Sequence, residues 1–285
     1  MTSPTSPAEG WVECRCGSRH WGRFGAAGLL LTDGARVVLQ HRASWSHHGD
    51  TWGFPGGAIR ADEDAITGAL RESAEEAGIP ADRVTVRATS VLRHPDWCYT
   101  TVLGRIDAGL AVRATDRESL AIEWVGIDDV ERLPLLPAFA QAWPMLRVML
   151  ITDVVVLVDA ANVVGSRPDG WWHDRAGANT RLVATLDRRA PDGVPATVLD
   201  RAGDLCWPTW TVVTEGQART VGGTSRVEVH GAPGSGDDTL VELTAQLAGS
   251  ADVVVVTADR QLRQRIHRAG GRSISPGPFR DWLES

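Results

Sequence analysis

Three glutamates at helical spacing are the residues of this sequence best suited to chemistry on phosphate. Glu72, Glu75 and Glu76 lie three and four residues apart in a segment whose pattern predicts a helix over residues 63–77. Residues at this spacing share one helix face, and like charges there destabilise an isolated helix by about 0.2–0.5 kcal/mol per pair. A divalent cation removes that repulsion, and Mg²⁺ prefers oxygen ligands. The cluster therefore indicates a metal site, with a solvated acidic helix face as the alternative interpretation.

Glycines border the expected helix on both sides. Gly56 and Gly57 precede it. Without a Cβ they let the backbone approach a ligand closely, so the Gly56 carbonyl can join the glutamates around a metal. Gly78 follows the helix and Pro80 comes two residues later, which is typical of a helix C-terminus. The expected site thus lies between a glycine-rich turn and a helix.

The spacing of the charged residues around this helix resembles the signature of the Nudix hydrolases. With U for a bulky aliphatic residue, that signature reads G-x5-E-x7-R-E-U-x-E-E-x-G-U. The matching positions are Gly57, Glu63, Arg71, Glu72, Glu75, Glu76, Gly78 and Ile79. Ser73 departs from the pattern, because an aliphatic residue is usual there. Upstream, Phe54, Pro55 and Gly56 are similar to the MutT-like members of the family.

The resemblance implies an α/β/α Nudix sandwich with a mixed sheet over residues 20–148, and cleavage of nucleoside diphosphates linked to another group. It implies Mg²⁺ (or Mn²⁺) held by Glu72, Glu75 and Glu76, assisted by the Gly56 carbonyl. The metal ions would neutralise the diphosphate and lower the pKa of the water that attacks phosphorus.

The same resemblance gives roles to the other motif residues. Arg71 is expected to orient the glutamates by ion pairing, and Glu63 to support the loop and helix together with Gly57 and Gly78. The catalytic set is then Arg71, Glu72 and Glu75 with a general base. Family members place that base within the motif or on a later loop, where Glu118 is the candidate.

Residues ahead of the motif are candidates for contact with a nucleotide substrate. Arg42 can contact phosphate, and Trp52 and Phe54 can line the pocket or stack on a base. Trp45, His47 and His48 lie in the same stretch. The alternative is that the aromatic side chains belong to the core and the histidines to a surface loop. The Nudix signature also occurs in isopentenyl diphosphate isomerases and nucleotide-binding regulators, but the complete set of motif charges favours hydrolysis.

A second acidic cluster is expected in the other half of the chain. Asp159 follows the buried strand expected at residues 154–158, and Asp259 follows the one at 253–256. Asp238 and Glu242 open the helix expected between them. Ligands of open α/β sheets bind beyond the carboxyl ends of the strands, so these acids should converge there. Such a cluster suits two-metal phosphodiester hydrolysis. The alternative is that Asp237 or Asp238 is the N-cap of the helix between them, and Asp259 the N-cap of the helix that follows it.

Residues 158–162, 236–242 and 256–259 resemble motifs of the NYN branch of the PIN-like ribonucleases. The resemblance implies Mg²⁺ or Mn²⁺ near Asp159, Asn162, Asp238, Glu242 and Asp259, with Asp237 as a further candidate. Six arginines near the end of the chain could follow the backbone of single-stranded RNA, or form a solvated face. They are Arg260, Arg263, Arg265, Arg268, Arg272 and Arg280.

The order of expected elements predicts two α/β domains. A hairpin around Asp33-Gly34, the glutamate helix, strands at 84–92, 99–106 and 122–125, and a helix at 138–149 make the first. Alternating strands and helices after residue 150 predict a doubly wound, mostly parallel sheet. The expected strands are 154–158, 196–199, 211–214, 227–230 and 253–256, and the helices are 174–189, 238–247 and 260–268. We expect a tail at 1–19, a Nudix domain at 20–148 and an NYN/PIN-like domain at 152–285.

Composition excludes several functional classes. All 29 basic residues are arginine, so no P-loop lysine or Schiff-base lysine exists. The net charge of −7 gives no global field toward nucleic acid or membrane. Four cysteines make no disulfide framework, and the N-terminal residues lack the pattern of a signal peptide. We expect a cytoplasmic protein without a membrane segment. The oligomeric state is left open.

Cys14, Cys16 and His20 form a smaller cluster near the N-terminus. They offer three ligands of the kind that zinc prefers, whereas structural zinc sites usually have four. The other cysteines, Cys98 and Cys206, are far along the sequence. Zinc binding and an unoccupied remnant are both open at this point.

Overall fold

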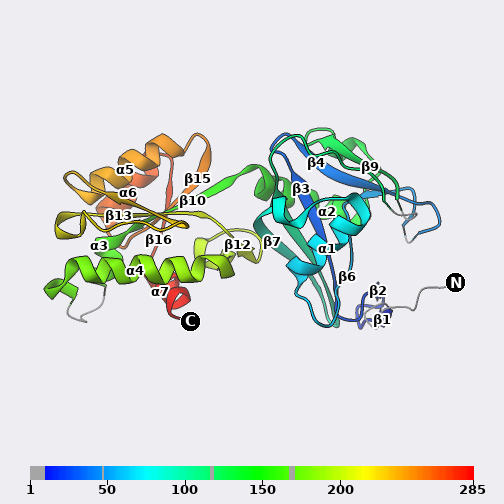
Figure 1. The fold of residues 1–285 in the computed structure, drawn as a ribbon, viewed down its shortest axis with the longest axis horizontal. Coiled ribbons are helices and arrows are strands. Elements are labelled where there is room, and N and C mark those ends of the chain that lie inside the picture. Colours follow the sequence, from blue (N-terminus) through cyan, green and yellow to red (C-terminus); the bar gives the residue numbers. More distant parts are fainter. Residues whose placement is uncertain (1–9, 47, 116–118, 167–170) are drawn as a thin grey trace. The chain divides into compact units, whose positions relative to one another are not determined.

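The computed structural model describes residues 10–46, 48–115, 119–166 and 171–285. The chain forms two compact units, Met1–Ile151 and Thr152–Ser285, which we call the N-terminal and C-terminal units (Figure 1). Each unit is described by itself. In the described ranges, no helix is both long and apolar enough to cross a membrane.

A mixed β-sheet forms the centre of the N-terminal unit. Its strands are β3 (Ala26–Thr32), β4 (Arg36–Arg42), β5 (Trp52–Gly53), β6 (Gly56–Ala58), β7 (Thr85–His94), β8 (Trp97–Arg105) and β9 (Ser119–Gly126). Strand β3 pairs parallel with β8 and antiparallel with β4 and β6. Antiparallel pairs β7–β8, β4–β5 and β4–β9 complete the sheet. Asp33 and Gly34 form the β3–β4 turn, as the sequence predicted.

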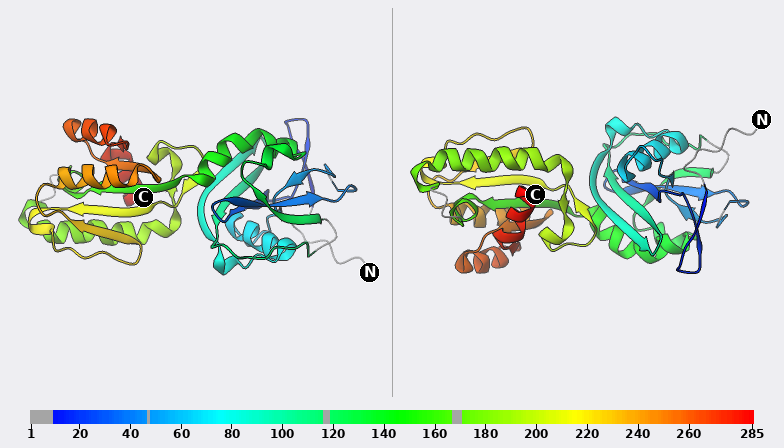
Figure 2. Two further views of the ribbon diagram at one scale, coloured as in Figure 1. Left: turned by 90° about the horizontal axis from the view of Figure 1, so that it is seen from above. Right: turned by 90° about the horizontal axis from the view of Figure 1, so that it is seen from below.

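One helix covers each face of this sheet (Figure 2). All seven residues of β3 are buried, and successive side chains of a strand point to opposite faces. Leu29 and Leu31 pack in one cluster with Ala69 of α1 (Ala65–Ala77). Leu30 packs in the other cluster with Trp143 of α2 (Pro137–Ile151). This is the α/β/α sandwich expected from the sequence.

The helix that carries the glutamates has defined ends. Asp64 is the N-cap, since its carboxylate accepts a hydrogen bond from the Thr67 N–H at 2.7 Å. Gly78 is the C-cap with φ 66°, a conformation that costs a glycine little. The helix therefore begins at Ala65, two residues after the expected start, and Glu63 remains in the preceding turn.

The C-terminal unit contains a five-stranded, fully parallel sheet with strand order β14-β13-β10-β15-β16. The strands are β10 (Asp153–Asp159), β13 (Thr209–Thr214), β14 (Val227–Gly231), β15 (Ala251–Val256) and β16 (Arg272–Ile274). The helices are α3 (Ala160–Gly165), α4 (Arg175–Arg189), α5 (Gly236–Leu247), α6 (Arg260–Arg268) and α7 (Pro276–Glu284). Val156 packs with the α4 and α7 side chains, and Leu157 with those of α5 and α6, so helices cover both faces.

The strand order places a topological switch point between β10 and β15. The chain extends the sheet from β10 through β13 to β14, then crosses to β15 on the other side of β10. Loops that follow two such strands leave in opposite directions and open a crevice at their carboxyl ends. Asp159 ends β10, and Asp259 comes three residues after the end of β15.

The strand expected at residues 196–199 is wrong. Ala196–Leu199 form a 3₁₀ helix, ended by Asp200 in a left-handed conformation with φ 50°. Pro195 immediately before it has no N–H to donate to a ladder, and the Asp200 N–H bonds back to the Thr197 carbonyl at 3.3 Å. The short pair β11 (Val194–Pro195) and β12 (Leu205–Cys206) flanks this turn.

Candidate functional site

Arg71 joins the carboxylates of the glutamate helix to the turn before it. Its Nε and Nη2 donate to the two oxygens of Glu63 at 3.0 and 2.6 Å. Its Nη1 donates to Glu72 at 2.7 Å and to Glu75 at 3.2 Å. The planar guanidinium suits these paired contacts. The hydrogen bond to the Glu63 carboxylate is the largest of the effects that raise the Arg71 pKa. Conversely, Arg71 lowers the pKa of Glu63. The ion pairs expected from Arg71 are therefore present.

Glu72 is largely shielded from solvent, with 17% of its side chain exposed. Burial raises its pKa, and Arg71 offsets only part of that effect. The carboxylate lies directly against the backbone of residue 57, where a Cβ would come within 2.7 Å of it. Gly57 is thus required by close approach, and the side chain of Glu72 is held between the glycine and Arg71.

Glu76 lies against the glycine-rich turn. Its Oε2 accepts a hydrogen bond from the Gly56 N–H at 3.0 Å, so the turn and the helix meet at this carboxylate. Tyr99 on β8 is close by, and burial, then the negative charge of Glu76, raises the pKa of its hydroxyl. Gly28 lies next to this hydroxyl, and a Cβ at position 28 would clash with it. Sequence reasoning missed Tyr99, although it is the sole tyrosine of the chain.

Glu75 is the carboxylate of the set that solvent reaches most easily, with 52% of its side chain exposed. Besides Arg71 it pairs with Arg60 at 3.4 Å, a second contact that no motif indicated. The Thr115 hydroxyl donates to the Glu75 backbone carbonyl, which brings the segment before residues 116–118 to the helix. Glu118, the expected general base, lies outside the described residues.

The departure at Ser73 has a local explanation. This side chain is fully buried on α1, and its hydroxyl donates to the Ala69 carbonyl one turn earlier at 2.7 Å. The hydroxyl is therefore satisfied within the helix. The substitution leaves the charged face of α1 unchanged.

The expected substrate-binding residues have different surroundings. Trp52 stacks on His41, with ring centroids 4.8 Å apart and planes 5° from parallel. Phe54 packs edge-on against Phe139 of α2 at 5.1 Å, so it contributes to the core as well. Arg42 ends β4 and is half-buried. His47 lies outside the described residues, and Trp45 is 69% exposed.

In the C-terminal unit, Asp159 is buried at the end of β10. One carboxylate oxygen accepts from the Asn162 N–H at 3.0 Å, which caps α3, and the other accepts from the Thr257 hydroxyl at 2.8 Å. Asn162 in turn accepts from the Ala258 N–H at 2.9 Å and so joins the two strand ends. Burial raises the pKa of Asp159, and nearby Asp237 and Glu215 raise it further.

The structure brings Asp237, rather than Asp238, toward this crevice. Burial and the charge of Asp259 raise the Asp237 pKa. Asp238 is 70% exposed and pairs with Arg265 at 2.5 Å. One residue turns a helix by about 100°, which explains the exchange. Glu242 is exposed and accepts from Gln246 at 3.3 Å. Metal roles for Asp238 and Glu242 stay predictions.

Glu215 is a member of this cluster that sequence reasoning missed. It follows β13, and its Oε2 accepts from the Gly236 N–H at the start of α5 at 2.7 Å. Its position after a strand of the parallel sheet was the available signal. Asp259 also caps its helix, since it accepts from the Leu262 N–H at 2.7 Å. The N-cap interpretation of Asp259 is therefore confirmed, whereas Ser235 rather than Asp237 or Asp238 is the N-cap of α5. Capping leaves carboxylate oxygens of Asp159 and Asp259 for other contacts.

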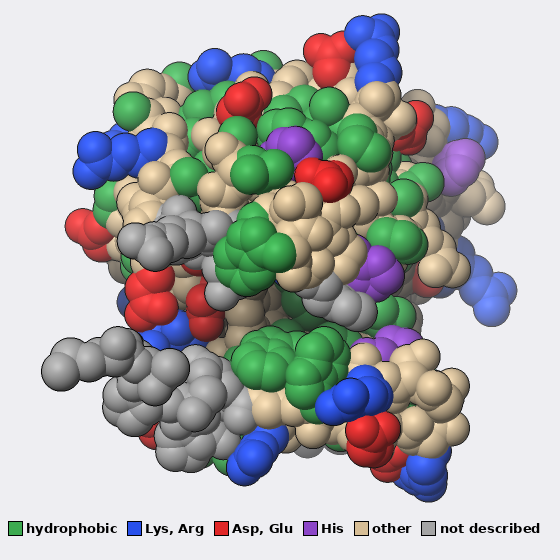
Figure 3. All heavy atoms as spheres, turned by 90° about the vertical axis from the view of Figure 1, so that its right-hand side faces the viewer, with side chains coloured by type: hydrophobic (Ala, Val, Ile, Leu, Met, Phe, Trp, Pro, Cys, Tyr) green, Lys and Arg blue, Asp and Glu red, His purple; other side chains and the backbone are tan. Residues whose placement is uncertain are grey.

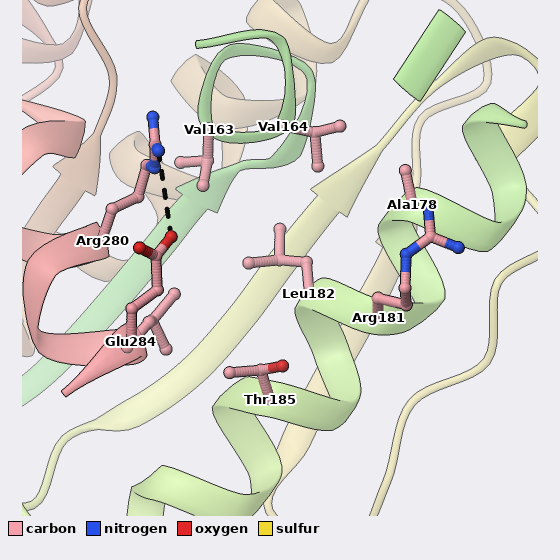
Figure 4. A pocket seen from close by; sticks show the side chains of 9 residues that line it. Val163, Val164, Ala178, Arg181, Leu182, Thr185, Arg280 and Glu284 are labelled. Atoms are coloured by element: carbon pink, nitrogen blue, oxygen red, sulfur yellow. Dashed lines mark ion pairs between the residues drawn. The ribbon is translucent and has the colours of Figure 1, made fainter. Parts of the chain in front are cut away.

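Several of the late arginines have structural partners. Arg272 donates to both oxygens of Asp252 at 2.9 and 3.0 Å, and Arg263 donates to the Ser273 hydroxyl at 3.0 Å. Arg280 pairs with Glu284 at 3.8 Å beside a pocket between α3, α4 and α7 (Figure 4). That pocket is lined by apolar side chains such as Val163 and by polar ones such as Arg181, and none of the strand-end carboxylates lines it. The arginines are thus not one continuous free surface.

Comparison with known proteins gives consistent matches for the N-terminal unit. Residues 22–148 match the model of the NUDIX domain. "Putative 8-oxo-dGTP diphosphatase 3" of Mycobacterium tuberculosis is 48% identical over 151 residues, covering 49% of this chain and 69% of that protein. The Nudix hydrolase RenU from M. smegmatis is 44% identical, covering 48% of this chain and 92% of that chain, with a TM-score of 0.45.

A further relative is much longer than the matched region. The "Nucleoside triphosphate pyrophosphatase/Nudix hydrolase fusion protein" of Bifidobacterium longum is 46% identical over 147 residues, covering 48% of this chain and 30% of that protein. This chain therefore spans under a third of the length of that relative. The signature residues around Arg71, the domain match and the mycobacterial relative agree, and the chain belongs to the Nudix family.

Proposed function

We propose that the N-terminal unit is a divalent-metal-dependent pyrophosphohydrolase that cleaves the diphosphate linkage of a nucleoside triphosphate or derivative. An oxidised purine nucleotide is the substrate class, because the mycobacterial relative bears the name of an 8-oxo-dGTP diphosphatase. The observation that carries the proposal is the Arg71 network, which fixes Glu63, Glu72 and Glu75 on one side of α1.

The donor set of this cluster fits Mg²⁺ or Mn²⁺. Its donors are carboxylate oxygens, which hard cations prefer over nitrogen or sulfur. Burial disfavours the charge on Glu72, and a cation beside it removes that cost. Glu72, Glu75 and Glu76 would hold the metal, with the Gly56 carbonyl as a further ligand. Bound metal would neutralise the diphosphate and lower the pKa of an attacking water.

The side chains of the chain itself supply position and proton transfer. Arg71 holds Glu72 in its buried rotamer, and Gly57 allows that rotamer. Glu75 is exposed to solvent and is therefore one candidate to accept the proton of the attacking water. Glu118 is the other candidate for this general base. Arg42 would contact the phosphates, and the flat surface of Trp52 beside His41 would support the base.

Hydrolysis of a nucleotide panel with Mg²⁺ tests the proposal. Glu76→Gln keeps the size of the side chain and removes a metal-binding charge, so we expect a rate loss of about a hundredfold or more. Glu131→Gln, an exposed glutamate of the same unit, is the matched control and should leave the rate unchanged. Full hydrolysis by Glu76→Gln would contradict the assignment. Comparing pH–rate profiles of Glu75→Gln and Glu118→Gln identifies the base, whose loss removes the acidic limb.

For the C-terminal unit we propose a PIN-like fold of the NYN type with metal-dependent nuclease activity on single-stranded RNA. The supporting observation is electrostatic proximity at the switch point of a parallel sheet: Asp237 and Glu215 raise the pKa of Asp159, and Asp259 raises that of Asp237. Neighbouring negative charges raise the pKa of Asp159 and Asp237, which favours a bound cation, and two-metal sites hydrolyse phosphodiesters. Arg260 and Arg268 on the adjacent helix α6 would approach the RNA backbone.

Cleavage of labelled single-stranded RNA with Mn²⁺ tests this second proposal. Asp159→Asn keeps the side-chain size and one oxygen that can cap α3 but removes the charge, so we expect RNA cleavage to be lost. Asp187→Asn, on α4 where the carboxylate accepts a hydrogen bond from the Thr224 hydroxyl at 2.6 Å, is the control and should cleave like the unchanged protein. Cleavage that is indifferent to Asp159→Asn would contradict a nuclease centre at this edge.

A further inference from the structure

A short hairpin at the start of the described chain gathers two thiols and an imidazole. Cys14 follows β1 (Trp11–Glu13), Cys16 is in the turn, and His20 is in β2 (Arg19–Trp21). Their ligand atoms all lie within 4.8 Å of one another, and Cys16 Sγ is 3.2 Å from His20 Nε2. Among the described residues, this trio is the one set of three Cys, His, Asp or Glu side chains that meets this distance.

The turn of the hairpin produces this convergence. The Cys14 N–H donates to the Ser18 carbonyl at 3.1 Å, and the Gly17 N–H donates to the Cys14 carbonyl at 2.9 Å. Gly17 has φ 85°, a left-handed conformation that glycine adopts without strain. The tight turn therefore places residues 14 and 16 beside strand β2, and the cluster depends on backbone geometry rather than on chance side-chain rotamers.

The hairpin is held by few contacts of its own, an edge-on pair of Trp11 and Trp21 at 5.3 Å and exposed contacts of Arg19 with Glu13 and Trp11. Each strand has three residues, and a two-stranded hairpin in isolation is marginally stable at best. From Trp11 to Trp21, Cys14 is the buried side chain, whereas Trp11 and Trp21 are each about two-fifths exposed. Figure 3 shows groups of hydrophobic side chains beside charged and histidine side chains on one face of the molecule. A small apolar core does not account for the order of this segment.

The hairpin is attached to the turn between β7 and β8. Arg15 donates to Asp96 through its backbone N–H at 2.8 Å and through Nε at 2.9 Å. His20 stacks on Trp97 with ring centroids 4.5 Å apart, and the Trp97 indole donates to the Trp21 carbonyl at 3.1 Å. A cross-link within the hairpin would therefore also fix its contact with the Nudix sheet.

We propose that Cys14, Cys16 and His20 bind one Zn²⁺ ion that stabilises the N-terminal hairpin against the β7–β8 turn. Two thiolates and an imidazole select zinc over Mg²⁺, which prefers oxygen ligands. Zinc with three protein ligands takes water as the fourth. The site is separate from the glutamate cluster in both donor type and element, and it does not depend on the proposed hydrolase activity.

Zinc content of the full, untagged chain tests this site directly. The protein is incubated with Zn²⁺ under reducing conditions, desalted in excess Mg²⁺ to keep zinc from the carboxylates, and measured by elemental mass spectrometry. We expect one zinc per chain, and none in the Cys14→Ser/Cys16→Ser double variant. Cys98→Ser, a cysteine of the same unit outside the trio, should retain the zinc. Absence of zinc from the unchanged protein, or equal zinc in the double variant, would overturn the proposal.

A second measurement on the unchanged protein guards against misfolded variants. Co²⁺ in place of zinc should give the intense absorption of cobalt–thiolate bonds. Hydrogen exchange should show that metal slows the amides of residues 10–22, and that a chelator reverses this protection while the amides of α1 stay unchanged. Equal exchange of residues 10–22 with and without metal would contradict the stabilising role.

Discussion

The two acidic clusters of this protein balance their charge in opposite ways. In the N-terminal unit, one arginine, Arg71, forms ion pairs with three glutamates and lowers the pKa of Glu63. In the C-terminal unit, Asp159 is held by the Thr257 hydroxyl and the Asn162 N–H, and burial raises its pKa. Ion pairs with Arg71 therefore offset the negative charges of the first cluster. In the second cluster, the ionised form of Asp159 is disfavoured by burial.

This contrast has a functional consequence. A carboxylate fixed by arginine keeps its geometry whether or not a cation is present. A buried carboxylate beside others favours its protonated form until a cation arrives. We therefore expect the glutamate cluster to be preorganised and the aspartate cluster to depend more strongly on metal for its charged state.

The largest expected effect comes from breaking the arginine network. Arg71→Ala leaves the buried Glu63 and Glu72 carboxylates without their counter-ion, which destabilises a protein by about 3–5 kcal/mol. Hydrogen exchange of the α1 amides in the full chain measures this loss. The exposed pair between Arg132 and Asp129 is the control, and Arg132→Ala should change the same amides by less than about 1 kcal/mol. Equal protection in both variants would show that Arg71 does not hold the cluster.

Gly57→Ala tests whether activity of the first cluster depends on the position of its carboxylates, because the substitution leaves every charge in place. The added Cβ would come within 2.7 Å of the Glu72 carboxyl and displace it. Misplacement by about 1 Å costs about a hundredfold in rate, so nucleotide hydrolysis should fall by that order. The control Gly78→Ala changes the C-cap, and should cost about 1 kcal/mol of stability with little change in rate. A Gly57→Ala enzyme with full activity would break the claim of preorganisation.

Glu63 of the first cluster and Asp159 of the second should respond to pH with opposite signs. Glu63 has a lowered pKa, so its stabilisation is present above its usual pKa of about 4.3 and is lost as pH falls through the lower folded value. Glu63→Gln should therefore cost about 2 kcal/mol at pH 7 and less in acid.

Asp159 has a raised pKa, so its destabilising charge is present above the folded pKa and disappears as pH falls toward about 3.9. Asp159→Asn should stabilise the metal-free C-terminal unit by about 1 kcal/mol at pH 7, with no gain near pH 4. Hydrogen exchange of α1 and β10 amides, corrected for intrinsic rates, measures both variants. Shifts of the same sign would remove the distinction between the clusters.

The smallest expected effect concerns the ion pair between Asp238 and Arg265 beside the second cluster. Asp238 and Arg265 are both exposed, so their attraction is screened by water. Asp238→Asn should change the stability of the C-terminal unit by less than about 1 kcal/mol, as measured by urea denaturation. A loss as large as that of Arg71→Ala would mean that the second cluster also relies on ion pairing.

The sequence predicted much of the first site because its spacing maps directly onto a helix. Asp64 and Gly78 bound the helix, and the i, i+3 and i, i+4 steps place Glu72, Glu75 and Glu76 together. Tyr99 and Arg60 were missed because their contacts come from β8 and from a loop, and no local pattern encodes such tertiary approach.

The second site was predicted at its strand ends but not in detail. Asp159 and Asp259 follow buried apolar strands, a strong signal for the edge of a parallel sheet. Which of Asp237 and Asp238 faces the crevice depends on the rotation of α5 about its axis. The helix begins at Gly236, two residues before the expected start. Glu215 carries no motif, and the turn at Ala196–Leu199 depends on Pro195, whose effect outweighed the apolar pattern.

One paired measurement tests the central claim that the glutamate cluster is the nucleotide-hydrolysing centre. Glu76→Gln and Asp159→Asn make the same carboxylate-to-amide change, one in each cluster, and nucleotide hydrolysis is measured for both full-length variants with saturating Mg²⁺. We predict that Glu76→Gln lowers the rate by about a hundredfold or more, while Asp159→Asn hydrolyses nucleotide like the unchanged protein. An unchanged rate for Glu76→Gln, or an equal loss for Asp159→Asn, would contradict the account.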